Sequence, residues 1–543
     1  MAEKINNAFH SAKGGAKESL GRGLGNEQMA AEGAAEKAQA QTRSNVNQAQ
    51  QQVHGTADNL AGRTKATVGA ATGNKSMEAQ GHMQSATAMS QNRASLIWNY
   101  MVPKAPLLIG TTLSHYTYGP PKPSWSYKFN ITMAMARAFA RHLDDFPLKH
   151  SQALSRLNDK YAPIHPRATT SESTVPNSYR DKAATYVDGL LSQQKLDSEK
   201  LGWDWKHDPR AEKPLTGEWT EPTDKDENFA EGRTVLYLHG GGYFLCSVKT
   251  HRWASWSMAR LGGAKVFSVD YRLAPDSPFP AAIHDALAAY LFLLDPPTDA
   301  GFAAVDPKNI VIMGDSAGGG LTFATMLAIR DSGLPMPAGI IGWSPWIDLM
   351  HSMPSVLDNA LSDYLPSEGF THGGQSSLKK LAKLVADVQD EDEEALLQKF
   401  PAMQHYAHNG LLNCKYVSPI LEDNLEGTCP IMIIAGDAEM LRDESIVFVK
   451  RHENAPTNLL LRVYDDMPHV FQMFGFLPSA KHSLRESGNF IRNVTLGGAG
   501  LPNKSLERID VRGERRPLEE EAVAGWKERV GKVGGGLKYL ARL

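Results

Sequence analysis

The sequence predicts an α/β fold class: a doubly wound, mostly parallel sheet with a helical cap or lid and helices on both faces. Two observations predict it. Short apolar runs recur from about residue 232, each followed by a turn and a helical stretch: VLYLH (235–239), KVFSVDY (265–271), NIVIMG (309–314), AGIIGW (338–343), PIMIIAG (430–436) and LLLRVYDD (459–466). These runs are apolar at nearly every position, as in parallel strands buried on both faces. Such sheets have right-handed crossovers and collect their active sites at the carboxyl ends of the strands.

The length and composition indicate a large globular protein with more than one region. The chain has 543 residues, of which 42% are hydrophobic. Its 57 Lys and Arg residues nearly balance its 60 Asp and Glu residues, and the formal net charge is -3. This balance gives no electrostatic reason for binding nucleic acid, so we expect no nucleic acid partner.

The cysteines and the N-terminus bear on the compartment and on metal binding. Cys246, Cys414 and Cys429 show no CxxC spacing, which argues against a zinc site and against a disulfide framework. The opening MAEKINNAFHSAKGG lacks the apolar core of a signal peptide. We therefore expect an intracellular protein, cytoplasmic or peripherally membrane-associated, that needs no metal and no organic cofactor.

Residues 1–95 are expected to form a low-complexity N-terminal arm. Phe9 is their only aromatic residue, and such a segment buries too little apolar area to offset its chain entropy. An internal repeat matches GGAKESLGRGLGNEQMAAEG (14–33) to GRTKATVGAATGNKSMEAQG (62–81). The repeat resembles the CsbD-like family of small hydrophilic stress-associated proteins. This resemblance implies a disordered or loosely helical arm, and a solubilising low-complexity tail is the alternative.

Three further regions follow the arm. Residues 96–230 are expected to form an N-terminal cap and lead-in, and residues 231–495 a catalytic domain. Between about 350 and 420 the strand rhythm stops, and we expect an insertion that acts as a lid over the carboxyl ends of the strands. Residues 496–543 are expected to form a C-terminal tail, whose basic last part has spaced Val, Leu and Tyr and reads as amphipathic.

Two segments are candidates for peripheral membrane contact. The first begins at Leu96 and ends at Leu113 (residues 96–113). It is apolar, but Asn99 and two prolines interrupt it, so we expect a buried or interfacial segment and not a membrane span. The second is the C-terminal tail, for which a solvated peripheral helix is the alternative.

The strongest chemical signal is GDSAGG at residues 314–319. It matches G-x-S-x-G between an apolar strand-like run and the helical run LTFATMLAIR, which is the context of a nucleophile elbow. Gly314 and Gly318 leave room for the neighbouring backbone, so the hydroxyl of Ser316 stands clear at the start of a helix. We expect Ser316 to be the nucleophile.

A glycine run, HGGGY, follows the first apolar run directly at residues 239–243. Consecutive glycines let backbone N–H groups approach a ligand oxygen, and acyl transfer needs such fixed donors for its oxyanion. We expect the amides of Gly241, Gly242 and Ala317 to be these donors, and Gly240 is a further option. His239 is expected to organise the loop and not to act as a base.

The base is expected after the acid in chain order. His469 comes just after the last apolar run and fits this position, whereas three other histidines are expected to be surface residues: His405, His408 and His452. The acid stays open, because DAEMLRDE after PIMIIAG offers three candidate carboxylates near one strand end, those of Asp437, Glu439 and Asp443.

Taken together, HGGG, SVDYRLAPDSPFPAAIHDA, GDSAGG, AEMLRDE and MPHVF resemble the hormone-sensitive lipase group of α/β-hydrolases across about residues 230–475. GPPKPSW, SPWIDL and YVSPI are similar to its fungal branch with steryl acetyl hydrolases. The resemblance implies an α/β-hydrolase fold and a triad whose acid is Glu439, in place of the usual Asp, ahead of Asp437 and then Asp443. It also implies that other residues only support the site: Asp315, Tyr271, Arg272 and Asp285.

The predicted function is hydrolysis of a small apolar carboxylic ester by Ser316, His469 and the acid. An acetylated sterol, a short acylglycerol or a secondary metabolite fits this class. Two alternatives stay open. One is an amidase or deacetylase of an N-acyl compound, and the other is a non-catalytic, stress-associated binding protein.

Overall fold

The computed structural model describes residues 104–144, 148–156, 162–366, 405–495 and 500–519, together with Glu32 and Asp159. Several predictions therefore lie outside the described residues. They are the N-terminal arm, residues 96–103, the centre of the predicted lid (367–404) and the tail beyond residue 519. Within the described part, a ten-stranded sheet has the order β1-β2-β4-β3-β5-β6-β7-β8-β9-β10.

The strands are β1 (Ala168–Val175), β2 (Leu215–Pro222), β3 (Thr234–Leu238), β4 (Lys265–Val269), β5 (Ile310–Asp315), β6 (Gly339–Trp343), β7 (Ile431–Gly436), β8 (Leu459–Tyr464), β9 (Lys504–Ile509) and β10 (Arg515–Pro517). The pairings from β4 through β9 are all parallel, and those of β1, β2 and β10 are antiparallel. The doubly wound, mostly parallel sheet is thereby confirmed.

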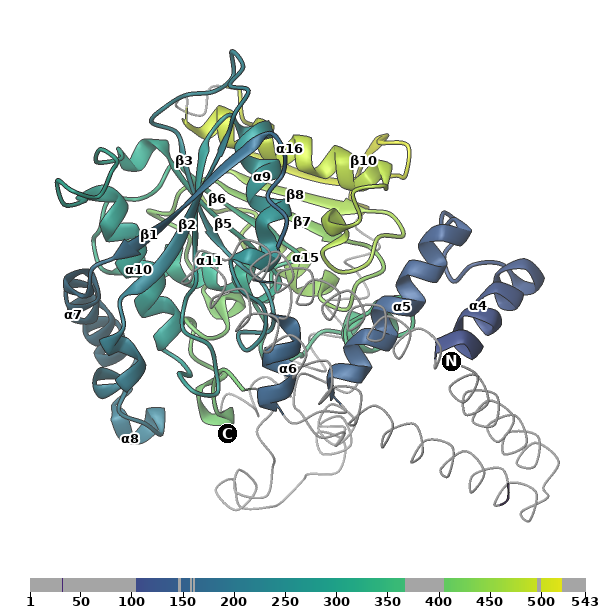
Figure 1. Cartoon of the computed structure of the whole chain (residues 1–543), viewed down its shortest axis with the longest axis horizontal. Coiled ribbons are helices and arrows are strands. Elements are labelled where there is room, and N and C mark those ends of the chain that lie inside the picture. The colour runs from purple at the N-terminus through teal and green to yellow at the C-terminus, as the bar shows by residue number, and fades with distance from the viewer. Residues whose placement is uncertain are drawn as a thin grey trace, which may run out of the picture. The chain divides into compact units, whose positions relative to one another are not determined.

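The α-helices among the described residues are α4 (Ala105–Tyr118), α5 (Tyr127–Asp144), α6 (Leu148–Ser155), α7 (Asn177–Gln193), α8 (Ser198–Leu201), α9 (Arg252–Gly262), α10 (Ala281–Leu294), α11 (Ser316–Asp331), α12 (Ser355–Asp358), α15 (Arg442–Arg451) and α16 (Pro478–Thr495). Short 3-10 helices are η3 (Trp205–His207), η4 (Pro209–Glu212), η5 (Lys249–His251), η6 (Pro307–Asn309), η7 (Asn409–Leu411), η8 (Pro419–Leu421) and η9 (Phe471–Met473). Helices α9 and α16 pack side by side, and α7, α10 and α11 form a second packed group (Figure 1).

The six predicted apolar runs are the six strands β3 to β8. Almost every side chain in them is buried, because helices cover both faces of the sheet. In the central register Leu236 lies between Phe267 of β4 and Ile312 of β5. The six strands therefore place their carboxyl ends on one edge of the sheet, where the candidate residues follow them.

The two predicted flanks also contribute strands, which their sequence pattern does not predict. The lead-in supplies β1 and β2, and the predicted C-terminal tail supplies β9 and β10, so the sheet extends beyond residues 231–495 on both sides. Strand β1 reads ATTSESTV and is half exposed, and β9 reads KSLERI with only its last residue buried. Their polar residues fit strands near a sheet edge but hide the apolar pattern that reveals central strands.

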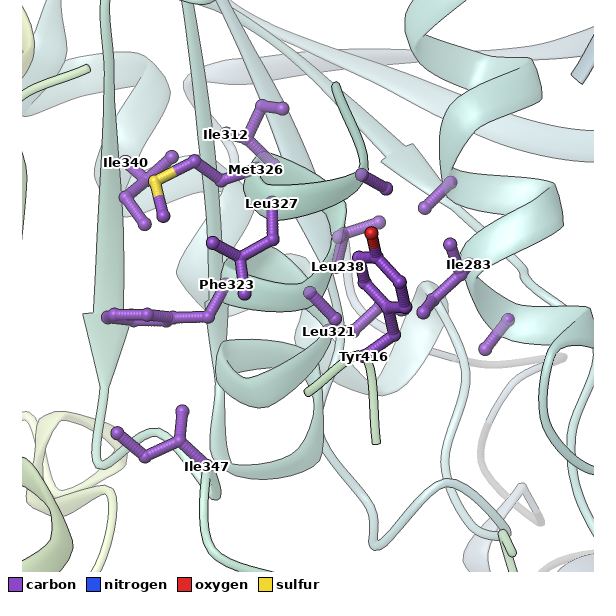
Figure 2. Packing of buried hydrophobic residues seen from close by; sticks show 14 of the residues in the cluster. Leu238, Ile283, Ile312, Leu321, Phe323, Met326, Leu327, Ile340, Ile347 and Tyr416 are labelled. Atoms are coloured by element: carbon purple, nitrogen blue, oxygen red, sulfur yellow. The ribbon is translucent and has the colours of Figure 1, made fainter. Parts of the chain in front are cut away.

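Helix α11, which begins at Ser316, is packed against the sheet along its length. Figure 2 shows Leu321, Phe323 and Leu327 of this helix among side chains from three strands, one helix and a later segment: Leu238, Ile312, Ile340, Ile283 and Tyr416. Burying one such side chain stabilises a fold by about 1.5–3 kcal/mol. The helix start is therefore held on a rigid support.

Helix α4 and the first turns of α5 belong to a separate compact unit. Within it, the hydroxyls of Thr112 and Tyr127 are 2.9 Å apart, and Asn130 Nδ2 lies 3.2 Å from His115 Nδ1. No helix among the described residues combines the length and the apolar character that a membrane crossing requires. Peripheral membrane contact through residues 96–113 or the tail stays a prediction.

Candidate active site

The candidate nucleophile, Ser316, lies at the turn between the carboxyl end of β5 and the first turn of α11. Its backbone has a φ of +53°, in the left-handed region that non-glycine residues seldom occupy. Such a strained conformation persists only where the surrounding structure enforces it, and it is typical of functional sites. The helix N-terminus adds unpaired N–H groups and the positive end of the helix dipole at this position.

The glycines beside Ser316 are required by close backbone contacts. A Cβ atom on Gly318 would lie 2.0 Å from the carbonyl oxygen of Leu238, and one on Gly314 would lie 2.4 Å from the same oxygen. On the far side of the turn, the amide of Trp346 donates to the carbonyl of Ser316 at 2.9 Å. The G-x-S-x-G spacing thus lets β3, β5 and the segment after β6 close around the serine.

The glycine loop follows β3 on the same edge of the sheet. Gly241 and Gly242 have φ values of +115° and +62°, which favour glycine. The amide of Gly240 already donates to the carboxylate of Asp315 at 3.1 Å. That bond removes Gly240 from the candidate oxyanion donors and leaves the amides of Gly241, Gly242 and Ala317.

His239 is buried behind this loop. Its Nδ1 lies 2.8 Å from the carbonyl oxygen of Gly240, and its ring stacks on Tyr271, with 4.5 Å between the ring centroids. The hydroxyl of Tyr271 donates to the carbonyl of His239 at 2.7 Å. Burial lowers the pKa of His239 to about 3, so the ring is neutral at pH 7. These contacts connect His239 to the glycine loop and to Tyr271.

Asp315 links the nucleophile turn to the glycine loop. Its carboxylate accepts hydrogen bonds from Tyr237 Oη at 2.6 Å and from the amide of Gly240, and His251 Nε2 lies 3.3 Å away. Burial alone would raise the pKa of Asp315, but the nearby His251 and the hydrogen bonds bring it below its ordinary value. The same carboxylate raises the pKa of His251 against the effect of burial. The carboxylate of Asp315 therefore joins the glycine loop, through the amide of Gly240, to the turn beside Ser316.

The candidate base, His469, lies in the loop after β8 and is buried. Burial lowers its pKa to about 3, so the imidazole is neutral at pH 7. Its ring nitrogens make no hydrogen bond with other described residues. The ring centroid of Tyr364 lies 5.9 Å from that of the imidazole.

Of the three candidate acids, Glu439 is the one that approaches the base. Its Oε2 lies 3.9 Å from Nδ1 of His469, and both side chains are buried. Asp437 instead pairs with Arg508 of β9 at 2.9 Å. Asp443 accepts from the amide of Ser355 at 2.9 Å. The two alternatives are therefore held by other partners, and the geometry favours Glu439.

Ser344 connects the acid to the base loop. It follows β6 directly with a φ of +44°, and its hydroxyl donates to Oε2 of Glu439 at 2.6 Å while accepting from the amide of Val470 at 2.9 Å. Burial raises the pKa of Glu439 well above its ordinary value, and the Ser344 hydrogen bond opposes that rise. Ser344 thus favours the ionised carboxylate next to His469.

Known proteins resemble this chain across the region that carries these residues. The family described as alpha/beta hydrolase fold matches residues 235–473. An acetyl-hydrolase of Streptomyces hygroscopicus is 33% identical over 287 residues, which are 53% of this chain and 82% of that protein. The chain belongs to the α/β-hydrolase family.

An esterase and a solved esterase structure are also similar to this chain. An esterase of Acinetobacter venetianus is 31% identical over 263 residues, which are 48% of this α/β-hydrolase and 75% of that protein. A crystal structure of an esterase from the bacterial hormone-sensitive lipase family is 27% identical, with a TM-score of 0.47. The match covers 67% of this chain and 98% of that one.

The predicted supports Arg272 and Asp285 of this α/β-hydrolase lie in a buried ion cluster. Asp285 accepts from the amide of Arg272 at 2.8 Å and from Nε of Arg180 at 2.7 Å. Arg272 also donates to Asp208 at 2.9 Å. Burial would raise the pKa of Asp285, but the two guanidinium groups lower it far more. The cluster joins α7 and the lead-in to α10.

The remaining histidines divide between the surface and the interior. His408 is exposed and His405 is partly exposed, whereas His452 is buried. The expectation of a surface position for His452 is therefore wrong, because its Nδ1 lies 2.7 Å from the carbonyl oxygen of Phe448 one helical turn earlier. Among the described residues, no group of three or more His, Cys, Asp or Glu side chains is arranged to hold a metal ion.

Three residues that contact the acid or base loop were not predicted from the sequence: Ser344, Asn359 and Asp363. Ser344 carries one available signal, because SPWIDL places it at the carboxyl end of a predicted strand. Asn359 and Asp363 carry none, since no strand or glycine motif precedes them. Their partners lie between 77 and 106 residues away in the chain.

Proposed function

We propose that this chain hydrolyses small apolar carboxylic esters, with Ser316 as nucleophile, His469 as base and Glu439 as the acid that supports it. The chain is a carboxylic ester hydrolase of the α/β-hydrolase family, in line with relatives named acetyl-hydrolase and esterase. The observation that carries the residue assignment is the strained turn at Ser316, built at the start of α11 beside a positive-φ glycine loop.

The proposed reaction runs through an acyl-enzyme. His469 takes the proton of the Ser316 hydroxyl as its oxygen attacks the ester carbonyl carbon. The amides of Gly241, Gly242 and Ala317 donate to the oxyanion that forms, and losing one such donor costs about 3 kcal/mol. The protonated His469 then gives its proton to the alkoxide, which leaves as the alcohol.

The second half repeats these steps with water. His469 deprotonates a water molecule that attacks the acyl carbon, and the tetrahedral intermediate collapses to release the carboxylic acid and Ser316. Glu439 stabilises the imidazolium in both halves, provided that it is ionised. Burial lowers the pKa of His469 and raises that of Glu439, so it disfavours the charged form of both side chains. The hydrogen bond from the Ser344 hydroxyl opposes this effect at Glu439, because it stabilises the ionised carboxylate.

The substrate proposed is an acetyl or other short acyl ester of an apolar alcohol. The name of the Streptomyces relative supports a short acyl group. The resemblance of SPWIDL and YVSPI to the fungal branch makes acetylated sterols the first natural substrates to test, followed by short acylglycerols and acylated secondary metabolites.

The test is hydrolysis of p-nitrophenyl esters from acetate to palmitate by the wild type and by the Ser316→Ala variant. We expect turnover by the wild type that is greatest for the shortest esters and is abolished by the substitution. A matched p-nitroanilide of the preferred acyl group serves as the amide control. Turnover that survives in the variant would reject Ser316 as the nucleophile, and faster cleavage of the anilide would reject the ester class.

A further inference from the structure

A short segment after α12, residues 359–364, lies along the backbone that carries the acid. Asn359 Nδ2 donates to the carbonyl oxygens of Asp437 at 3.0 Å and Glu439 at 2.8 Å. The hydroxyl of Ser362 donates to the carbonyl of Ala438 at 2.9 Å. Three consecutive residues of the acid loop are thus bound through their main chain by one segment.

Asp363 extends this contact to the base. One of its carboxylate oxygens accepts from the amide of Met440 at 2.7 Å, next to Glu439. The other accepts from the amide of His469 at 3.2 Å and from that of Tyr364 at 2.7 Å. The side chain is fully buried. A single carboxylate therefore binds the main chain of His469 and that of Met440, the residue after the acid.

The base loop needs such an anchor because its backbone is strained. Asp466 has a φ of +59° and Val470 has a φ of +42°, which is unfavourable for any non-glycine residue and most of all for a β-branched one. The two amides at the strained end of this loop have acceptors on other segments. The amide of His469 donates to the carboxylate of Asp363, and the amide of Val470 donates to the hydroxyl of Ser344.

The charge on Asp363 suits this task. Burial raises its pKa to about 6, and the amides that bind it oppose the rise, so the carboxylate is ionised at pH 7 to 8. Arg137 of α5 approaches from another element and donates through Nε to the carbonyl of Asp363 at 2.6 Å. Arg137 therefore binds the backbone of the segment, while the carboxylate of Asp363 binds the two loops.

We infer that Asp363 is a positioning residue, which sets the distance between Glu439 and His469 by binding the main chain of both loops. The inference rests on the proposed function, because it assigns Asp363 a part in a reaction carried out by those two side chains. Asp363 touches no reacting atom. Its loss lets the strained base loop relax, and a displacement of about 1 Å in a catalytic group lowers turnover by about 100-fold.

The experiment compares Asp363→Ala and Asp363→Asn with the control Asp348→Ala. Asp348 is also fully buried and accepts amides, those of Met350 at 3.2 Å and Ser352 at 2.8 Å, but it binds neither triad loop. kcat and KM are measured on the best p-nitrophenyl ester below the melting temperature of every variant. Hydrogen–deuterium exchange is followed in peptides covering residues 437–440 and 465–471.

We expect Asp363→Ala to lower kcat by about 10- to 100-fold with KM nearly unchanged and to speed exchange in both peptides. Asp363→Asn keeps one oxygen acceptor and should recover part of kcat. Asp348→Ala should lose stability but keep both kcat and the protection of the two peptides. A folded Asp363→Ala variant with wild-type kcat, or with wild-type exchange in the 465–471 peptide, would overturn the inference. A wild type that turns over no ester would instead reject the proposed function, and the exchange data would still decide whether Asp363 holds both loops.

Discussion

Replacing Ser344 by alanine removes one oxygen that serves two partners. Its hydroxyl donates to Oε2 of Glu439 and accepts from the amide of Val470, and all three groups are buried. After Ser344→Ala the carboxylate loses its donor and the amide loses its acceptor. We expect the ionised form of Glu439 to become less favourable, because the Ser344 hydrogen bond lowers the pKa that burial raises.

The magnitude follows from the strength of a hydrogen bond to a charged group, which is about 1.5–3 kcal/mol. If that amount is lost from the ionised triad, kcat/KM at pH 7 falls by about 10- to 100-fold. The sign of the pH effect is also fixed. Ionised Glu439 supports His469, so a higher pKa for Glu439 moves the acidic limb of the kcat/KM profile to higher pH, and part of the loss is recovered at alkaline pH.

The matched control is Ser487→Ala. Ser487 is also fully buried and hydrogen-bonded, as the acceptor of Trp343 Nε1 at 2.9 Å and the donor to the carbonyl of Ser483, but it reaches neither the acid nor the base. We expect the control to lower the melting temperature while kcat/KM and its acidic limb stay unchanged. A Ser344→Ala variant with wild-type kcat/KM and an unmoved acidic limb would refute the role of Ser344.

Two further predictions concern the fold. Gly318→Ala should unfold the nucleophile turn or sharply lower the melting temperature, because its Cβ would lie 2.0 Å from the carbonyl oxygen of Leu238. Gly189→Ala instead meets open space in α7 and should stabilise the chain by about 0.5–1 kcal/mol in chemical unfolding. Equal melting temperatures for the two variants would contradict this reasoning. Asp285→Asn should cost about 3–5 kcal/mol, because buried Arg180 loses its carboxylate partner and buried Arg272 keeps only that of Asp208. Since those groups depress the pKa of Asp285, its contribution to the free energy of unfolding is complete above about pH 4 and is lost as the pH falls further. The melting temperature of the D285N variant should therefore fall less between pH 5 and pH 3 than that of the wild type. Parallel curves of melting temperature against pH would count against the ion cluster.

The sequence was informative where the physics is local. The six apolar runs became β3 to β8 because strands covered on both faces must be apolar at nearly every position. The elbow at Ser316 was readable because only glycine fits beside it, within two residues in the chain. In contrast, β1 and β9 carry polar residues suited to exposed positions near a sheet edge, and no short pattern separates them from loops.

The rest of the site depends on contacts between distant segments. The three candidate carboxylates all follow β7, and their spacing alone does not rank them. Asp437 pairs with Arg508 of β9, a strand in the predicted tail, whereas Glu439 approaches His469. The anchoring of His469 by Asp363 joins residues 106 positions apart, so it appears only once the chain is folded.

The central claim is that Ser316 is the activated nucleophile, and covalent labelling tests it most directly. The wild type is treated with a fluorophosphonate, and the added mass is located by peptide mass spectrometry, with Ser316→Ala and His469→Ala beside it. We predict a single label on Ser316 that is absent in the first variant and forms much more slowly in the second. A label on another serine, or one that forms equally fast in the His469→Ala variant, would contradict the proposed site.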